Sequence, residues 1–426
     1  MQKLPLDPRQ EPEVAGGTAT AMLTRTAPIQ QAPPSGSSTA PRLASLDGLR
    51  GLAALVVLVC HTLLTVPRLG ELAYHSGRSM PGTWEWWLVE TPLHVAWEGT
   101  GAVYVFFVLS GFVLALPFTR PAAAGGAPRW RDPRLWRSYY PKRLARLYLP
   151  VWGAVALAAA VWALVPRPKT GSGWVDAMGA PVTWEGIAGD VTLLFTDGLV
   201  VPPLWSLRWE MWFSLLLPLY LVLGLALPAR LRAPRWAVWA AMGAVIVGGG
   251  FSHDGVLRDL PLFLLGVLLA AHREPLAAWA ARLGAGARGQ ARSRWIWPGL
   301  LAVGLTGLWL PWPLGTDSPA AHWSWSAGAV ALVVVALHWG PAVRVLSGRA
   351  ASWLGTISFS LYLTHEPIVV AAYHLVGPPA AGGGLAALWV SMPLGLAASL
   401  AVAAVFQRIV ERPSHRVARW LGRRFS

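Results

Sequence analysis

A stretch of about 24 residues near the N-terminus, Leu43 to Val66, constrains the fold most, because it is apolar enough to cross a membrane yet carries ionisable side chains. It reads LASLDGLRGLAALVVLVCHTLLTV. As a helix, this length spans a hydrocarbon core of roughly 30 Å. Asp47, Arg50 and His61 are costly in lipid, so we expect them to face a cavity or the protein interior.

These three side chains share one stripe of the expected helix. Arg50 and His61 are separated by eleven positions, which leaves them about 20° apart around the axis, with Asp47 within about 60° of both. A rise of about 1.5 Å per residue puts His61 roughly 16 Å deeper than Arg50, near the bilayer midplane if Arg50 lies at the surface. The alternative for His61 alone is a hydrogen bond to a neighbouring helix without any chemistry.

The whole chain predicts an all-α polytopic membrane protein. Of its 426 residues, 54% are hydrophobic and 13% charged, and long apolar runs recur. The short apolar segment 187–201 could be re-entrant or lie on the surface. We expect about ten transmembrane helices, over residues 44–66, 97–118, 144–165, 204–227, 236–250, 257–272, 296–313, 322–340, 352–375 and 385–410.

The net charge of +15 is explained by membrane topology and not by nucleic-acid binding. With both termini on one side, the segments on that side hold 26 Lys and Arg residues and the opposite loops hold four. This asymmetry predicts cytoplasmic termini in a multi-pass protein of the cell membrane, with the lipid bilayer as partner. Residues 1–42 predict a disordered cytoplasmic tail, 43–413 a membrane-embedded domain and 414–426 a basic tail.

Three further segments carry candidate chemistry. In KRLARLYLP, Arg143 and Arg146 are three residues apart and can hold one polyanion, although most loop arginines are better explained by topology and lipid headgroups. In PLWSLRWEMWF, Ser206 and Glu210 share a face. A carboxylate at the depth of Glu210 needs a partner, either from another helix or, as a structural ion pair, from Arg208 or Arg258.

The third segment is SFSLYLTHEPIVV, in which Ser358, Tyr362 and His365 form a polar stripe. His365 is expected at a depth similar to that of His61. Two buried histidines with a carboxylate and an arginine in reach favour a titratable cluster over two structural residues. The single cysteine, Cys60, excludes internal disulfides and Cys-based metal sites. No metal is expected, and the motifs of phosphate loops, metalloproteases and serine hydrolases are absent from the sequence.

Taken together, the segments resemble the acyltransferase-3 family of integral membrane acyltransferases. Glu411-Arg412-Pro413 adds a further match, and the resemblance runs from Leu43 to Pro413. Arg208 and Trp209 depart from the pattern, since the family more often has a small residue and an aliphatic one there. The matches are LDGLRGLAALVVLVCH for Arg, ten residues, His; KRLARLYLP for Arg-x-x-Arg; LWSLRWEMWF for Trp-Ser-Leu-x-x-Glu; and SFSLYLTHEPIV for Ser-x-Ser-Leu-Tyr-Leu-x-His.

The resemblance implies transfer of an acyl group, commonly acetyl, from cytoplasmic acyl-CoA to a hydroxyl of a sugar, polysaccharide, cell-envelope glycan or secondary metabolite. A short form without an extracellular esterase-like domain is expected. His61 is favoured as general base, with His365 and Glu210 as the other catalytic candidates. The expected CoA-binding residues are Arg50, Arg143 and Arg146, and the expected substrate-binding residues are Asp47, Ser206, Arg208, Tyr362 and Arg258.

Two other classes compete with this interpretation. A secondary transporter or flippase would use the intramembrane polar residues as a path without bond chemistry. A sensor or scaffold would tolerate replacement of His61.

The topology is testable with reporter fusions. Fusions at Gly77 and Gly383 are expected to report the outside, and a fusion at Gly286 the inside, because the basic segments stay in the cytoplasm. An inside signal at Gly383 would contradict the arrangement of ten helices.

Overall fold

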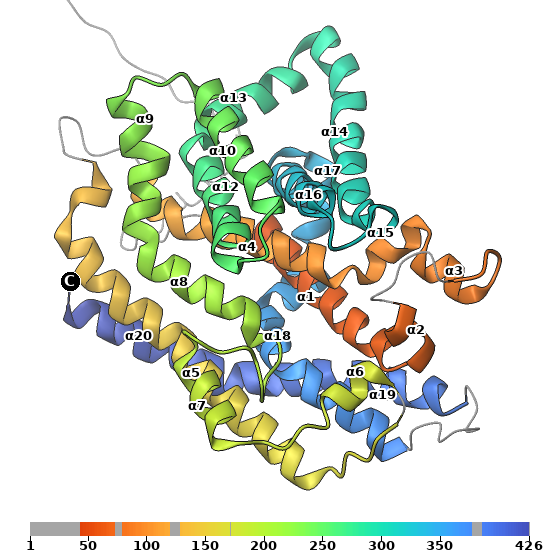
Figure 1. Cartoon of the computed structure of the whole chain (residues 1–426). Helices are drawn as coiled ribbons and strands as arrows, with labels where there is room; N and C mark the ends of the chain where they lie inside the picture. The colour runs from red at the N-terminus through yellow and green to blue at the C-terminus, as the bar shows by residue number, and fades with distance from the viewer. Residues whose placement is uncertain (1–42, 73–78, 120–127, 171, 377–385, 426) are drawn as a thin grey trace, which may run out of the picture. The chain divides into compact units, whose positions relative to one another are not determined.

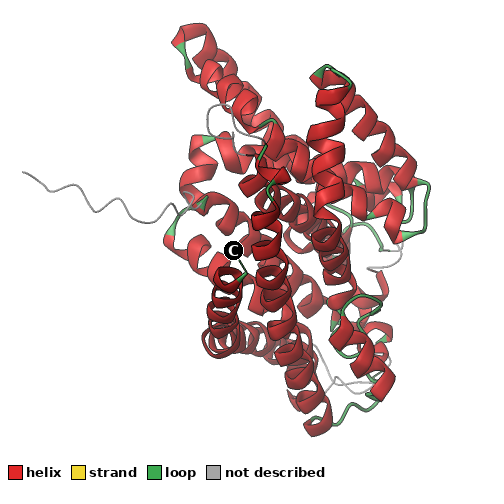
Figure 2. Cartoon of the chain, turned by 90° about the vertical axis from the view of Figure 1, so that its left-hand side faces the viewer, coloured by secondary structure: helices red, strands yellow, loops and turns green. Residues whose placement is uncertain are grey.

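The computed structural model describes residues 43–72, 79–119, 128–170, 172–376 and 386–425, and in these ranges the secondary structure is entirely helical (Figure 2). The predicted tail 1–42 and the fusion sites Gly77 and Gly383 lie outside the described residues. Two short 3₁₀ helices (η1, η2) and two π-helical turns (η3, η4) interrupt the α-helices.

The elements appear in chain order in Figure 1. They are α1 (Ala44–Leu64), α2 (Pro67–Leu72), α3 (Trp84–Val89), η1 (Pro92–Trp97), α4 (Gly99–Thr119), η2 (Arg129–Arg131), α5 (Pro133–Leu164), α6 (Gly173–Ala177), α7 (Trp184–Thr192), α8 (Leu204–Leu221), η3 (Val222–Ala226), α9 (Leu227–Arg230), α10 (Arg235–Gly250), α11 (Gly255–Arg258), α12 (Leu260–Ala271), α13 (Arg273–Gly284), α14 (Gly286–Trp309), α15 (Pro311–Leu314), α16 (Pro319–His338), α17 (Gly340–Leu346), α18 (Arg349–Val376), α19 (Ala386–Phe406), η4 (Gln407–Glu411) and α20 (Arg412–Arg424).

Among the described residues, six helical segments are long and apolar enough to cross a membrane, and a broken pair bent by 64° makes a seventh if it forms one span. The protein is therefore an all-α polytopic membrane protein. The other predicted spans coincide with α10, α14 and α18, which do not meet the same limits of length and hydropathy, so the count of ten remains a prediction. The six segments are α1, α4, α5, α8 to α9, α16 and α19 to α20, and the bent pair joins α11 and α12 to α13.

One predicted boundary differs from the structure, and the segment 187–201, whose form was left open, contains a helix end and a loop. Helix α5 begins at Pro133, well before residue 144, because the Asp132 side chain accepts a hydrogen bond from the Arg134 N–H and Pro133 suits the first helical turn. Segment 187–201 contains the end of α7 and a loop. The buried Asp190 carboxylate accepts hydrogen bonds from the N–H groups of Val200 and Val201 (2.9 and 2.8 Å), which ties that loop down.

Helices α1 and α18 cross in close backbone contact at glycine residues. A Cβ at Gly51 would lie 2.3 Å from the Gly355 backbone nitrogen, and a Cβ at Gly355 would lie 2.3 Å from the Asp47 carbonyl oxygen. Only glycine allows so close an approach, which is the usual device of helix pairs in membranes. The two backbones therefore touch over the turn that carries Arg50.

A second glycine crossing joins α4 to α12. A Cβ at Gly111 or at Gly266 would lie 2.1 Å from a carbonyl oxygen of the other helix. Buried aromatic and aliphatic side chains of α4, α8, α12 and α16 surround this crossing and form the larger apolar core. The core thus holds α4 beside α1, on the side of α1 that faces away from solvent.

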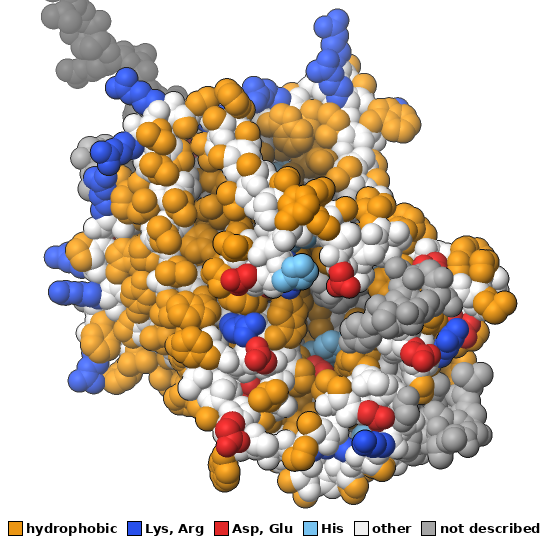
Figure 3. Space-filling model, viewed as in Figure 1, with side chains coloured by type: hydrophobic (Ala, Val, Ile, Leu, Met, Phe, Trp, Pro, Cys, Tyr) orange, Lys and Arg blue, Asp and Glu red, His pale blue; other side chains and the backbone are white. Residues whose placement is uncertain are grey.

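Charged side chains are unevenly distributed over the surface. Figure 3 shows Lys and Arg side chains along the left and upper edges of the viewed face, and a broad apolar surface over α8 to α12 beside them. Asp and Glu side chains lie over the centre and the lower half of this face, with a few Lys or Arg side chains among them. Such a division is typical of a protein with one basic, cytoplasmic side, while the orientation of the termini stays a prediction.

The α1 to α18 crossing predicts a difference between two glycine substitutions. Gly355→Ala should lower the free energy of unfolding in detergent by about 1 to 3 kcal/mol, because the two helices must move apart. The matched control is Gly299→Ala in α14, where a Cβ meets nothing within 4 Å. Equal denaturation curves for the two variants would contradict the close crossing.

Candidate active site

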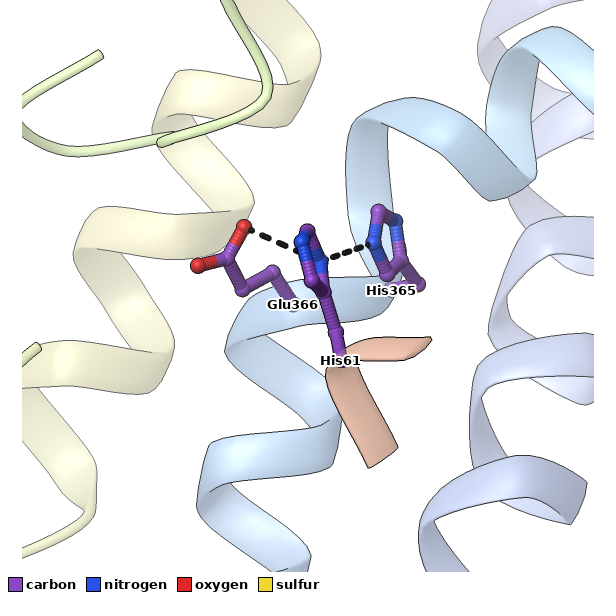
Figure 4. A group of neighbouring side chains, drawn as sticks. All are labelled: His61, His365 and Glu366. Carbon is purple, nitrogen blue, oxygen red and sulfur yellow. Dashed lines mark hydrogen bonds and ion pairs between the residues drawn. The ribbon is translucent and has the colours of Figure 1, made fainter. Parts of the chain in front are cut away.

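His61 of α1 and His365 of α18 meet directly. The His61 Nδ1 and His365 Nε2 atoms are 2.8 Å apart, which is a hydrogen-bond distance (Figure 4). His365 is buried with 1% exposure, whereas the His61 side chain keeps 22%. Two histidines that are 304 residues apart in the chain therefore form one pair, of which only His61 reaches accessible space.

The backbone around His365 determines which ring nitrogen carries each proton. Its Nδ1 lies 2.9 Å from the Leu361 carbonyl oxygen and 3.0 Å from that of Tyr362. Carbonyl oxygens only accept hydrogen bonds, so Nδ1 of His365 is the protonated nitrogen and Nε2 of the neutral ring is an acceptor. His61 must then donate from Nδ1, which leaves the lone pair of His61 Nε2 free to take a proton.

Glu366 is a member of this cluster that the sequence analysis did not single out. Its Oε2 lies 3.5 Å from His61 Nδ1 and has no hydrogen-bond partner among the described residues. The carboxylate is 1% exposed. At this distance the interaction is electrostatic and favours a positive charge on His61. Its position directly after His365 in the sequence was the available signal.

His61 lies near one end of α1, and its expected depth near the bilayer midplane stays a prediction. It lies in the last turn of α1, three residues before the helix ends at Leu64. The indole of Trp174 in α6 packs on it, with ring centroids 5.5 Å apart. The base candidate therefore lies toward the end of α1 remote from Arg50, beneath a short helix of the following region.

A cavity of about 120 Å³ brings most of the predicted site residues together. It is lined by side chains from α1, α4, α5, α8, α18, η4 and α20, which come from distant parts of the sequence. Leu147, Phe106, Phe107 and Phe359 add an apolar wall. Its polar lining residues are Arg50, Ser110, Arg143, Arg146, Ser206, Glu210, Ser358, Tyr362, Glu411 and His415.

Two of the three arginines in this cavity already have protein partners. Arg50 donates to the Gly355 carbonyl (3.1 Å) and the Ser358 hydroxyl (3.0 Å), and lies 3.6 Å from the Asp47 carboxylate. Arg143 pairs with Glu210 and donates to Ser214. The partner of the Glu210 carboxylate is thus a guanidinium from another helix, and it is neither Arg208 nor Arg258.

Arg146 differs from both, because it makes no hydrogen bond or ion pair with any residue in the described ranges, although Glu411 and Glu210 act on it electrostatically. It is therefore the guanidinium most ready to receive an anion. Ser206 and Tyr362 both line the cavity, and their hydroxyl groups are hydrogen-bonded with the oxygens 2.6 Å apart.

The remaining predicted substrate-binding residues lie elsewhere. Arg208 pairs with Asp197 at 2.8 Å, and its guanidinium lies over the Trp209 ring. Arg258 pairs with the buried Asp259 at 3.1 Å. Neither lines the cavity described above. Their proposed contact with substrate stays a prediction.

Sequence reasoning missed two further buried groups. Glu411 accepts a hydrogen bond from Ser360 (2.6 Å) and lies 3.7 Å from His415, at the cavity. His94 and Glu98, both buried, form a 2.9 Å pair at the start of α4, next to Cys60. The Glu-Arg-Pro motif pointed to the first group, whereas a His and a Glu four residues apart were the only signal for the second.

The side chains of His61, His365 and Glu366 lie close enough together to be considered as metal ligands. It offers three ligand atoms within 4.8 Å of one another. Tetrahedral zinc at about 2.0 to 2.1 Å from nitrogen sets two ligand atoms about 3.3 Å apart. The two ring nitrogens are closer than this, at 2.8 Å, so the rings would have to separate. The arrangement fits proton transfer better than metal binding.

Comparison with known proteins gives two matches. A family model described as an acyltransferase domain matches residues 43–408. Acyltransferase MdmB of Streptomyces mycarofaciens is 29% identical over 216 residues, which are 48% of this chain and 45% of the relative. The match thus spans a little under half the length of that relative. No solved structure matches the chain.

The Arg143 to Glu210 pair predicts a coupling that denaturation can measure. Arg143→Met should lower the free energy of unfolding by about 1 to 3 kcal/mol, because it leaves the half-buried carboxylate unpaired, and Arg143→Met with Glu210→Leu should recover most of the loss. Arg68→Met, which breaks the exposed pair with Glu71, is the control and should change little. Additive losses in the double variant would contradict the coupling.

Proposed function

The chain belongs to the acyltransferase-3 family and is an acyltransferase, and on that premise we propose that it moves an acyl group from acyl-CoA to a hydroxyl with His61 as general base. Acetyl is the proposed acyl group. The observation that carries the proposal is the hydrogen bond between the two histidines, with His365 Nδ1 held by two backbone carbonyls. It leaves His61 Nε2 as the free base.

In the proposed reaction, His61 alone takes up the proton and returns it. Nε2 takes the proton of the acceptor hydroxyl while the hydroxyl oxygen attacks the thioester carbonyl carbon, and the tetrahedral intermediate forms. The C–S bond then breaks, and the imidazolium returns its proton to the CoA thiolate. The products are an acyl ester and free CoA, and no covalent enzyme intermediate is needed.

His365 and Glu366 support this cycle in different ways. His365 is a positioning residue, because it holds the His61 ring in one orientation and one tautomer. Glu366 lies within 3.5 Å of His61 Nδ1, where its negative charge stabilises the imidazolium that forms in the first step. A buried carboxylate whose Oε2 has no hydrogen-bond partner among the described residues is suited to this role, since the charge that appears on His61 becomes its partner.

The donor is proposed to enter from the side of Arg50, Arg143 and Arg146. CoA carries phosphates that need cations, and Arg146 is the guanidinium without a hydrogen-bonding partner among the described residues. The cavity of about 120 Å³ is smaller than the roughly 300 to 1,000 Å³ of most ligand sites. The nucleotide therefore lies outside it, and only the pantetheine arm passes Ser358 and Tyr362 toward His61.

The acceptor is proposed to be a hydroxyl of a sugar, polysaccharide, cell-envelope glycan or secondary metabolite. Ser206 and Tyr362 are proposed to contact it near the base, while Arg208, Arg258 and Asp47 keep their predicted roles in substrate binding. The relative MdmB is likewise named an acyltransferase. We place the enzyme in the cell membrane, on the strength of its apolar helices and the positive-inside pattern.

Replacement of the two histidines should have different kinetic effects. His61→Ala should lower turnover at least about a hundredfold with CoA binding intact, because the base is lost. His365→Ala should lower turnover and also raise the apparent Michaelis constant for the acceptor. The assay is release of free CoA from acetyl-CoA by the purified protein in detergent, with hydroxyl-bearing fractions of a cell extract as acceptors.

The control for both variants is His272→Ala, at the end of α12 and outside the cavity lining, where Nδ1 lies 2.9 Å from the Leu268 carbonyl and the ring packs near Trp239. It should keep normal turnover. Near-normal turnover of folded His61→Ala would reject His61 as the base and make His365 the candidate. Absence of CoA release with every acceptor fraction would favour a transporter.

Donor binding should depend on Arg146 without a loss of stability. Arg146→Gln should weaken the measured CoA affinity by about 1.5 to 3 kcal/mol, the cost of one charge-assisted phosphate contact. Arg143→Gln should weaken CoA binding and also destabilise the fold, because Glu210 loses its partner. Unchanged CoA affinity in both variants would contradict the proposed donor site.

A further inference from the structure

A second cavity, called here the outer cavity, lies on the far side of α6 from His61. It is lined by Arg167, Lys169, Asp176 and His374 together with the small and apolar residues around α6. Its volume is about 420 Å³, within the range of small-molecule sites. The proposed mechanism does not use any of these residues.

The outer cavity and the active site share two structural elements. Trp174 of α6 packs on the His61 ring, while the next residues of the same short helix, Val175 to Ala177, line the cavity. His374 follows His365 by nine residues on α18, which is about 13.5 Å along the helix axis. A molecule in the outer cavity is therefore one short helix away from the base.

The charges of the outer cavity are mostly positive. Arg167 is fixed in place, since its guanidinium lies 4.6 Å from the Trp162 ring centroid and donates to the Met178 carbonyl. Lys169 is exposed. His374 Nδ1 is buried without a hydrogen-bond partner in the described ranges. Asp176 is the only acidic lining residue, and it accepts two hydrogen bonds from Thr170 (2.7 and 2.8 Å).

This positive charge runs against the charge distribution of the chain. The predicted outer loops hold only four basic residues, Arg68, Arg78, Arg167 and Lys169, against 26 on the predicted cytoplasmic side. Two of these four line one cavity. Membrane topology does not explain them, because the positive-inside rule disfavours basic residues there.

We infer that the outer cavity binds a phosphate group of the acceptor, and so holds the acceptor while its hydroxyl reaches His61 past Trp174. The inference rests on the proposed function. A fixed guanidinium beside a flexible ammonium is a common anion site. The anion can belong to a soluble metabolite or to a lipid-linked molecule, since the cavity recognises the same chemistry in both.

Binding of defined probes to the purified protein in detergent and in nanodiscs tests the inference. Glucose 6-phosphate should bind and glucose should not. Arg167→Gln with Lys169→Gln should weaken the binding at least tenfold. Arg68→Gln is the matched control, because Arg68 is a basic residue of a predicted outer loop outside the cavity, and it should keep the affinity.

The source of the anion is distinguished by a second probe. If glucose 6-phosphate does not bind but nanodiscs with phosphatidate do, and if the same double variant loses that binding, the anion belongs to a lipid, which still supports an anion site. Lys169→Glu, an exposed substitution that leaves the packed Arg167 in place, should also lose at least tenfold and guards against misfolding. Equal binding of all variants, or no phosphate-dependent binding at all, overturns the inference.

The same preparation separates this inference from the proposed function. CoA binding and His61-dependent CoA release are measured alongside the phosphate probes. If both persist while phosphate binding is absent, the outer cavity is not an acceptor site and the general-base mechanism stands. If replacement of His61 leaves CoA release unchanged, the mechanism fails whatever the cavity binds.

Discussion

The close crossing of α1 and α18 is the interaction on which the site depends. At Gly51 and Gly355 the two backbones approach so closely that no side chain fits between them. From this point Arg50 reaches the Gly355 carbonyl and Ser358, and eleven residues further along α1 His61 reaches His365. Because both helices are rigid rods, a contact fixed at one place sets the position of the histidines at the other.

Backbone carbonyls, which only accept hydrogen bonds, determine which nitrogen of each histidine carries a proton. Carbonyl oxygens of α18 hold the proton of His365 on Nδ1, and this single constraint passes through the histidine pair to leave a lone pair on His61. Protonated His61 then has Glu366 as its counter-charge. In a site of low dielectric such pairs are stronger than in water, so one carboxylate decides where a transient positive charge is stable.

Much of this arrangement was predictable, for identifiable reasons. Helical periodicity placed Arg50 and His61 on one stripe, and depth along the helices brought His61 and His365 to comparable levels. Which side chains pair between helices could not be predicted from helical periodicity. The partners of Glu210 and Arg208 are Arg143 and Asp197, and neither pair follows from spacing within a segment. Glu366 was missed because a helical wheel does not reveal which neighbouring helix a side chain meets. The His94 to Glu98 pair was missed although its four-residue spacing was visible, because that spacing alone does not show that both side chains are buried.

The central claim is that the neutral His61 ring carries its proton on Nδ1 and leaves Nε2 unprotonated, and ¹⁵N NMR of histidine-labelled protein tests it most directly. The His61 signals are identified by their loss in His61→Gln. The account predicts a neutral His61 ring with the proton on Nδ1 and a neutral His365 ring, also protonated on Nδ1. A proton on His61 Nε2 in the resting protein would contradict it, because the nitrogen assigned to take the acceptor's proton would already be occupied.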